Sequence, residues 1–148
     1  MASEHDALPR SADETSIRRL DVEILSVDWG TLKRTTYAQR RRDGVTVELI
    51  RESYGRGDGV VVLPCDVARR RVILVRQFRP PVWEAEGREP LWEAPAGLLD
   101  EADPAARALA EVEEETGLRL RRLDPLFVAW SSPGSFTERM HYFLGVYE

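Results

Sequence analysis

Two uninterrupted apolar runs constrain the fold of this chain more than any other feature of its sequence. Residues 60–63 are Val-Val-Val-Leu and residues 72–75 are Val-Ile-Leu-Val, with no polar residue inside either run. Such runs are typical of strands covered on both faces, because a half-exposed strand alternates apolar and polar residues. We therefore predict that both runs lie inside a mixed sheet covered by helices, and that Pro80-Pro81 stops the second strand.

The segments around these runs extend the pattern. Residues 118–130 and 140–147 are predicted to be further strands, separated by the turn residues Ser131-Ser132-Pro133-Gly134. The stretch 83–90 is polar and contains glycine, so we predict a loop there.

The first third of the chain has a different pattern. Residues 20–25, 32–37 and 45–50 alternate apolar and polar side chains, with Trp29-Gly30 and Asp43-Gly44 as turn signals between them. This predicts three antiparallel strands. A sheet this small has open edges and must pack on something, and a partner subunit is one candidate.

One helix is strongly signalled at residues 104–116. Asp103 suits the N-cap, Pro104 the first helical position, and Gly117 the position after the last turn. At about 100° per residue, five side chains share one arc and are predicted to face the core. These are Ala105, Ala108, Leu109, Val112 and Thr116.

Three acids of this helix, Glu111, Glu114 and Glu115, share a second face near its C-terminal end. Like charges at this spacing repel, and the helix dipole disfavours anions there. A hard divalent cation such as Mg²⁺ or Mn²⁺ would remove both objections, because it prefers carboxylate oxygens and shares its shell with substrate phosphates. Periodicity alone leaves a second interpretation open, a solvated acidic face paired with arginines such as Arg107.

Composition excludes several classes of protein. The 148 residues carry a net charge of −5, which argues against binding to a nucleic-acid backbone. No apolar run approaches the ~18 residues of a membrane span, so no membrane association is expected. Cys65 is the single cysteine, which favours a reducing, cytoplasmic location.

The stretch from Gly97 to Leu118 resembles the Nudix box, G-x5-E-x7-R-E-U-x-E-E-x-G-U with U aliphatic. From Glu111 to Leu118 every specified position matches. The first half is one residue shorter than the pattern, with Asp103 in place of the early Glu and Ala110 in place of the Arg. Arg107, four residues before Glu111, is a candidate substitute for that arginine.

Outside the box the similarity extends over residues 42–148, through the segments 76–79, 93–100 and 132–138. These segments resemble the ADP-ribose and GDP-mannose pyrophosphatase branch of the Nudix hydrolase superfamily. The resemblance implies an α+β fold, an α/β/α sandwich with a mixed central sheet, plus the N-terminal antiparallel three-stranded sheet. It also implies Mg²⁺-dependent hydrolysis of a nucleoside diphosphate sugar to a nucleoside monophosphate and a sugar phosphate.

The resemblance assigns roles to individual residues. Glu111 and Glu115 are the expected main metal ligands, with Glu114 binding directly or through water and the Ala96 carbonyl completing the shell. The expected catalytic residues are these three glutamates and Glu138, a stand-in for the general base that relatives carry on a later loop. The expected substrate-binding residues are Arg76, Arg79, Glu93 and Glu138.

The residue pattern and the resemblance together predict the domain organisation. We expect a mobile polar tail over residues 1–17, the N-terminal sheet over 18–55, and the Nudix domain over 56–148, C-terminally truncated because the chain ends within a predicted strand. Relatives form homodimers through this N-terminal sheet, so we expect a homodimer here as well. The alternative function is a Nudix-fold module that binds a nucleotide without cleaving it, which the altered first half of the box favours.

Overall fold

A computed structural model describes residues 16–88 and 90–147 of the chain. Its contacts divide the chain into two compact units, with the division after Tyr54. Most of the tail expected over residues 1–17, namely residues 1–15, lies outside the described residues.

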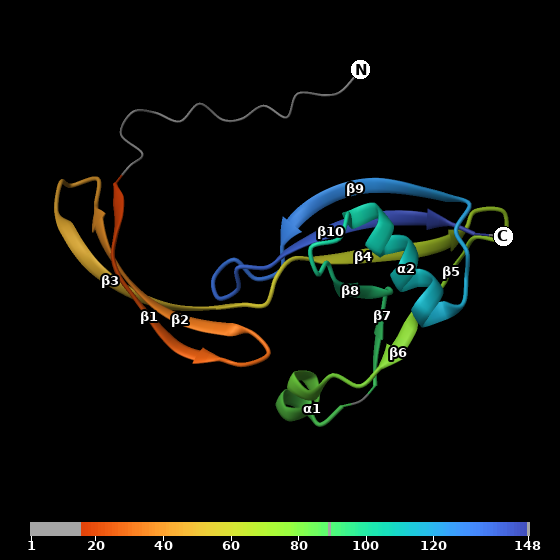
Figure 1. The fold of residues 1–148 in the computed structure, drawn as a ribbon, viewed down its shortest axis with the longest axis horizontal. Helices are drawn as coiled ribbons and strands as arrows, with labels where there is room; N and C mark the ends of the chain where they lie inside the picture. Colours follow the sequence, from red (N-terminus) through yellow and green to blue (C-terminus); the bar gives the residue numbers. More distant parts are fainter. Residues whose placement is uncertain (1–15, 89, 148) are drawn as a thin grey trace, which may run out of the picture. The chain divides into compact units, whose positions relative to one another are not determined.

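The first unit contains an antiparallel sheet in the order β1-β2-β3, which confirms the three predicted strands (Figure 1). The strands are β1 (Ile17–Val27), β2 (Thr31–Arg40) and β3 (Thr46–Gly55). Gly44 adopts a φ of +84° in the turn before β3, where the Asp43 side chain accepts a hydrogen bond from the Val45 amide at 3.0 Å. Most residues of β1 are exposed, so this sheet buries little apolar surface within its own unit.

The second unit contains a mixed sheet in the order β5-β4-β10-β9, with β8 also paired to β4. Its strands are β4 (Gly59–Asp66), β5 (Arg71–Val72), β8 (Ala96–Leu98), β9 (Arg122–Trp130) and β10 (Arg139–Val146). Strand β10 runs parallel to β4 and antiparallel to β9. The central position of β4 explains why its residues 60–63 are apolar without alternation.

The second apolar run, residues 72–75, does not form one buried strand, and this prediction was wrong. Strand β5 ends at Val72, and the chain leaves the main sheet before β6 (Val75–Gln77) pairs with β7 (Leu91–Glu93) in a separate two-stranded sheet. Val72 is 51% exposed and Leu74 42% exposed, so this run is not covered on both faces. Strand β9 also begins later than predicted, at Arg122.

Helix α2 (Pro104–Thr116) has the predicted bounds. The Asp103 side chain accepts hydrogen bonds from the amides of Ala105 and Ala106, and Gly117 closes the helix with a φ of +71°. The loop predicted over residues 83–90 is wrong in its first half, because helix α1 (Pro80–Glu86) occupies that stretch. Its prolines at the start and Gly87 after its end are the same signals that mark α2, over a much shorter length.

The α+β class, the mixed sheet and the separate N-terminal antiparallel sheet are confirmed. Among the described residues, α2 is the one long helix that packs on the mixed sheet. Neither helix in this part of the chain has the length and apolar character needed to cross a membrane.

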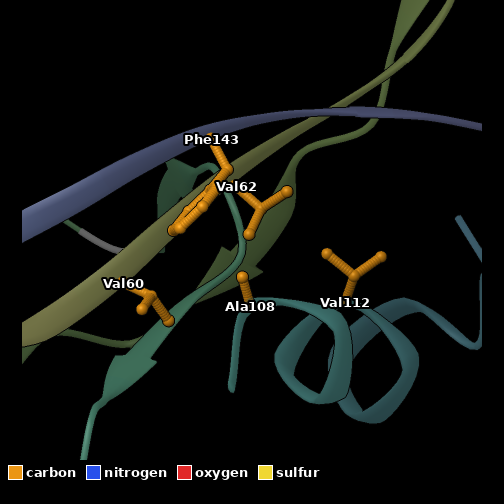
Figure 2. Close-up of a cluster of buried hydrophobic side chains, with 5 residues drawn as sticks. All are labelled: Val60, Val62, Ala108, Val112 and Phe143. Carbon is orange, nitrogen blue, oxygen red and sulfur yellow. The ribbon is translucent and has the colours of Figure 1, made fainter. Parts of the chain in front are cut away.

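The core of the second unit lies between β4, β10 and α2 (Figure 2). It is formed by five buried side chains, Val60, Val62, Ala108, Val112 and Phe143. Two residues predicted to face the core do not, since Leu109 is 45% exposed and Ala105 is also exposed. The helix is turned so that Glu111, rather than Leu109, lies next to Ala108 and Val112 on the buried side.

We expect Val112→Ala to lower the free energy of unfolding by about 2 kcal/mol, because it removes two buried methyl groups and leaves a cavity. Leu109→Ala on the same helix is the matched control and should cost less than about 1 kcal/mol. Urea denaturation followed by circular dichroism measures both. A larger loss for Leu109→Ala would contradict the observed orientation of the helix.

Candidate active site

The carboxylates of Glu111 and Glu115 converge on two adjacent residues of β8. A side chain at Gly97 would overlap the Glu111 carboxylate, so this position has room for that acid because it is glycine. The Ala96 amide donates a hydrogen bond to Glu115 Oε2 at 3.3 Å. Two acids one helical turn apart therefore reach neighbouring points of one strand, as the capped helix α2 places them on one face.

Side chains of the chain itself hold these acids. Arg107 pairs with Glu111, lies 3.4 Å from Glu114 Oε1 through Nη1, and donates from Nε to the Leu98 carbonyl at 3.1 Å. Gln77 Nε2 donates to Glu115 Oε1 at 2.6 Å. The sequence indicated Arg107 but missed Gln77. The one available signal for Gln77 was its place inside the segment 76–79.

Burial and like charge make Glu111 hard to ionise. The residue is 5% exposed, and this burial is the main cause that raises its pKa. Arg107 opposes the rise, whereas the charges of Glu115 and Glu114 add to it. A cation at this position would favour the ionised carboxylate.

The donor chemistry of the cluster fits a hard divalent cation. Glu111, Glu114 and Glu115 supply carboxylate oxygens, and Ala96 lies in contact with one of them. As they stand, no three acidic, histidine or cysteine side chains among the described residues are grouped closely enough to hold a metal ion. In this arrangement Arg107 contacts Glu111 and Glu114, and Gln77 contacts Glu115.

Arg79 and Glu93 form a second polar pair beside this cluster. Arg79 Nε lies 3.0 and 2.9 Å from the two Glu93 oxygens, and its Nη2 lies 2.6 Å from Oε2. Hydrogen bonding to Glu93 raises the pKa of Arg79, and the negative charge of Glu115 adds to this effect. The structure thus brings Arg79, Glu93 and Glu115 into one electrostatic neighbourhood.

Arg76 lies on the face of β6 opposite to that of Gln77, the residue that contacts Glu115. It alternates with the inward-facing neighbours Val75 and Gln77, and its guanidinium lies 5.7 Å from the ring centre of Trp92, its cross-strand partner. A groove of about 420 Å³ runs along residues 73–77 and reaches Glu115 and Thr116.

Glu138 is not brought to the acidic cluster. It is 6% exposed, and its Oε1 accepts from Arg56 Nε at 3.1 Å. Ala96 is level with Val61, which is level with Tyr142 on β10. Glu138 is therefore displaced from Ala96 by about 13 Å along the strands and about 10 Å across them.

Two family models together match the whole described part of the chain. Residues 16–54 match the model described as GDP-mannose pyrophosphatase NudK N-terminal domain, and residues 55–148 match the NUDIX domain model. A solved structure described as an ADP compounds hydrolase superposes with a TM-score of 0.68 at 19% identity, covering 92% of this chain and 70% of that one. At this identity the likeness concerns the fold alone.

Curated relatives are similar over most of this chain. A GDP-mannose pyrophosphatase of Pectobacterium atrosepticum is 40% identical over 131 residues, which cover 87% of this chain and 67% of the relative. A protein of the same name from Cronobacter sakazakii is 39% identical, with 85% and 66% covered. A third, from Klebsiella pneumoniae, is 40% identical, with 84% and 64% covered. The chain thus spans about two thirds of the length of these relatives.

The raised pKa of Glu111 predicts a pH dependence of stability. The folded chain binds more protons than the unfolded chain between the ordinary glutamate value of about 4.3 and the raised value. The free energy of unfolding contributed by Glu111 therefore falls as pH rises through this window. We expect Glu111→Gln to lack this fall and to gain stability relative to the unaltered chain as pH increases.

Urea denaturation between pH 4 and pH 8 in the presence of EDTA measures this difference. Glu113→Gln is the matched control, because Glu113 is exposed on the same helix and pairs with the exposed Arg119. Parallel pH profiles for Glu111→Gln and the unaltered chain would contradict the argument from burial.

Proposed function

We propose that this chain, which belongs to the NUDIX family, hydrolyses the pyrophosphate bond of a nucleoside diphosphate sugar to a nucleoside monophosphate and a sugar phosphate. The observation that carries the proposal is the convergence of Glu111 and Glu115 on residues 96–97. Relatives named GDP-mannose pyrophosphatase, at about 40% identity, support GDP-mannose as the first substrate to test. ADP-ribose is the second.

The proposal includes a Mg²⁺ site, for which Mn²⁺ could substitute. Glu111 and Glu115 would be the main ligands, with Glu114 binding directly or through water and the Ala96 carbonyl completing the set. When bound, Mg²⁺ supplies charge neutralisation for the pyrophosphate and acidifies a water molecule for attack at phosphorus. The close approach of the Glu111 carboxylate to Gly97 and the oxygen chemistry of the donors support this assignment.

Arg79 is the proposed diphosphate-binding residue. Its guanidinium already makes forked contacts with the Glu93 carboxylate, and the same planar arrangement of donors suits two phosphate oxygens. Glu93 would orient Arg79 and face the substrate from the same pair of strands. Arg76, stacked over Trp92 on the opposite face of β6, would contact a more distant part of the substrate.

The position of Glu138 argues against a direct role as general base. Its pairing with Arg56 connects the segment before β10 to the segment before β4, so we propose that Glu138 supports the substrate site from a distance. The candidates for the general base are therefore the residues close to the acidic cluster and water.

Release of phosphate in a phosphatase-coupled assay tests the function. The panel should include GDP-mannose, ADP-ribose and other nucleotide sugars, each with Mg²⁺ and with EDTA. We expect turnover with Mg²⁺ alone, and GDP-mannose ahead of ADP-ribose. Absence of metal-dependent turnover across the panel would contradict the enzymatic function.

The second candidate is a nucleotide-binding module without catalysis. The specific observation in its favour is that Arg107 and Gln77 already engage all three acids. Calorimetric binding of a nucleotide sugar by a chain that shows no turnover would favour this candidate.

Glu115→Gln should lower Mg²⁺-dependent turnover by about two orders of magnitude or more, because it removes a charged metal ligand. Its melting temperature in EDTA should stay close to that of the unaltered chain, since the amide can still contact Gln77 and like-charge repulsion is relieved. Glu113→Gln is the control for charge alone. Full activity of Glu115→Gln would contradict the ligand assignment.

We also propose a cytoplasmic homodimer formed through the N-terminal sheet. Val22 and Ile24 alternate with acidic residues along β1, share one face and are 39% and 50% exposed, which supports a covering partner. Sedimentation should give twice the 16.9 kDa mass of the chain. Val22→Asp should shift the protein to monomer, whereas Asp21→Asn on the other face should not.

A further inference from the structure

The guanidinium of Arg107 connects three groups of the acidic site. Its Nε donates to the Leu98 carbonyl at 3.1 Å, its Nη1 lies 3.4 Å from Glu114, and its Nη2 pairs with Glu111. The side chain is only 25% exposed. The guanidinium of Arg107 thus contacts both strand β8 and two of the three acids of the site.

Glu111 depends on this cation. A carboxylate at 5% exposure is unfavourable unless a positive charge or hydrogen bonds compensate for the lost hydration. Among the ion pairs that the described residues make, Glu111 takes part in one, the pair with Arg107. The nearest acids, Glu114 and Glu115, make the local charge more negative.

The two kinds of contact use different nitrogen atoms. The bond to Leu98 uses Nε, whereas the bonds to the acids use the two terminal nitrogens. The terminal bonds can therefore break while the Nε bond keeps the side chain in place. A lysine has a single nitrogen and cannot keep both sets of contacts in this way.

We propose that Arg107 is a resident counter-ion of the acidic site: it holds Glu111 and Glu114 in the metal-free chain and releases them to a divalent cation. The bond to Leu98 keeps its guanidinium beside the site after the exchange. Arg107 is thus a positioning residue that also lowers the affinity for the metal. This inference rests on the metal site of the proposed function.

The positive charge of Arg107 opposes binding of a divalent cation at the adjacent acids. A divalent cation about 6 Å from a unit positive charge is repelled by a factor of about ten in binding, even with a water-like dielectric. Removal of the Arg107 charge should therefore tighten metal binding while it destabilises the metal-free fold. A purely structural residue would not tighten binding when it is removed.

Three variants of the full chain test this: Arg107→Gln, Arg107→Lys and, as a control, Arg119→Gln, whose arginine is 85% exposed and pairs with Glu113. Electron paramagnetic resonance of free Mn²⁺ gives the affinity, and thermal unfolding with EDTA or saturating Mn²⁺ gives the stability. We expect Arg107→Gln to bind Mn²⁺ roughly five- to tenfold more tightly and to melt lower in EDTA. Its melting temperature should rise more with Mn²⁺ than that of the unaltered chain.

Arg107→Lys keeps the charge but cannot keep both the bond to Leu98 and the contacts with the acids, so its affinity should fall between those of the unaltered chain and Arg107→Gln. The affinity of Arg119→Gln should stay within about twofold of the unaltered chain. An Arg107→Gln chain that folds only with Mn²⁺ also supports the proposal, because the metal then replaces the lost charge. Unchanged or weaker Mn²⁺ binding by Arg107→Gln overturns it, as does a variant unfolded in both conditions.

Glu115→Gln separates this inference from the proposed function. If the unaltered chain binds Mn²⁺ and Glu115→Gln weakens that binding, the metal site stands, and Arg107→Gln alone decides the inference. If the unaltered chain binds no Mn²⁺, or Glu115→Gln binds it equally well, the metal site itself is refuted and the inference with it.

Discussion

Glu111 places a carboxylate at 5% exposure between the backbone of Gly97 and the guanidinium of Arg107, on the face of α2 that packs against the sheet. The helix is oriented so that this acid is buried. Ala108 and Val112 flank the acid in the core, and Leu109 is turned out to 45% exposure. A helix placed by hydrophobicity alone would bury the leucine and expose the glutamate. The packing of α2 therefore buries a carboxylate, which is unfavourable, and places it against Gly97 of β8.

Both parts of the candidate site are held by charges of the chain itself. Arg107 compensates Glu111 and Glu114, and Glu93 compensates Arg79. A metal diphosphate carries the complementary charges, positive toward the acids and negative toward the arginine. On binding, the metal would take over the contacts of Glu111 and Glu114 with Arg107, and a phosphate would share Arg79 with Glu93. The internal pairs hold the side chains of the site in place. A ligand must also compete with these pairs in order to bind.

Local signals in the sequence predicted what depends on local structure. Asp103, Pro104 and Gly117 fixed the bounds of α2, and the unbroken run at residues 60–63 identified the central strand β4. The spacing of the three glutamates placed them on one face of the helix. The orientation of that helix was not predictable in the same way, because the apolar arc included Leu109 and Ala105, and the contact of Glu111 with Gly97 depends on a strand elsewhere in the chain.

The contact between Gln77 and Glu115 joins residues 38 positions apart and could not be read from either segment alone. It depends on a break in the chain path. Had residues 72–75 continued as one strand of the main sheet, as their composition suggests, Gln77 would follow β5 along the edge of β4. Instead β5 ends at Val72, the Ile73 amide donates to the Pro64 carbonyl of β4 at 3.0 Å, and β6 then pairs with β7 in a separate sheet. The apolar run is therefore interrupted, although this leaves Val72 and Leu74 partly exposed. The interruption brings Gln77 and Arg79 close to Glu115 near the end of α2.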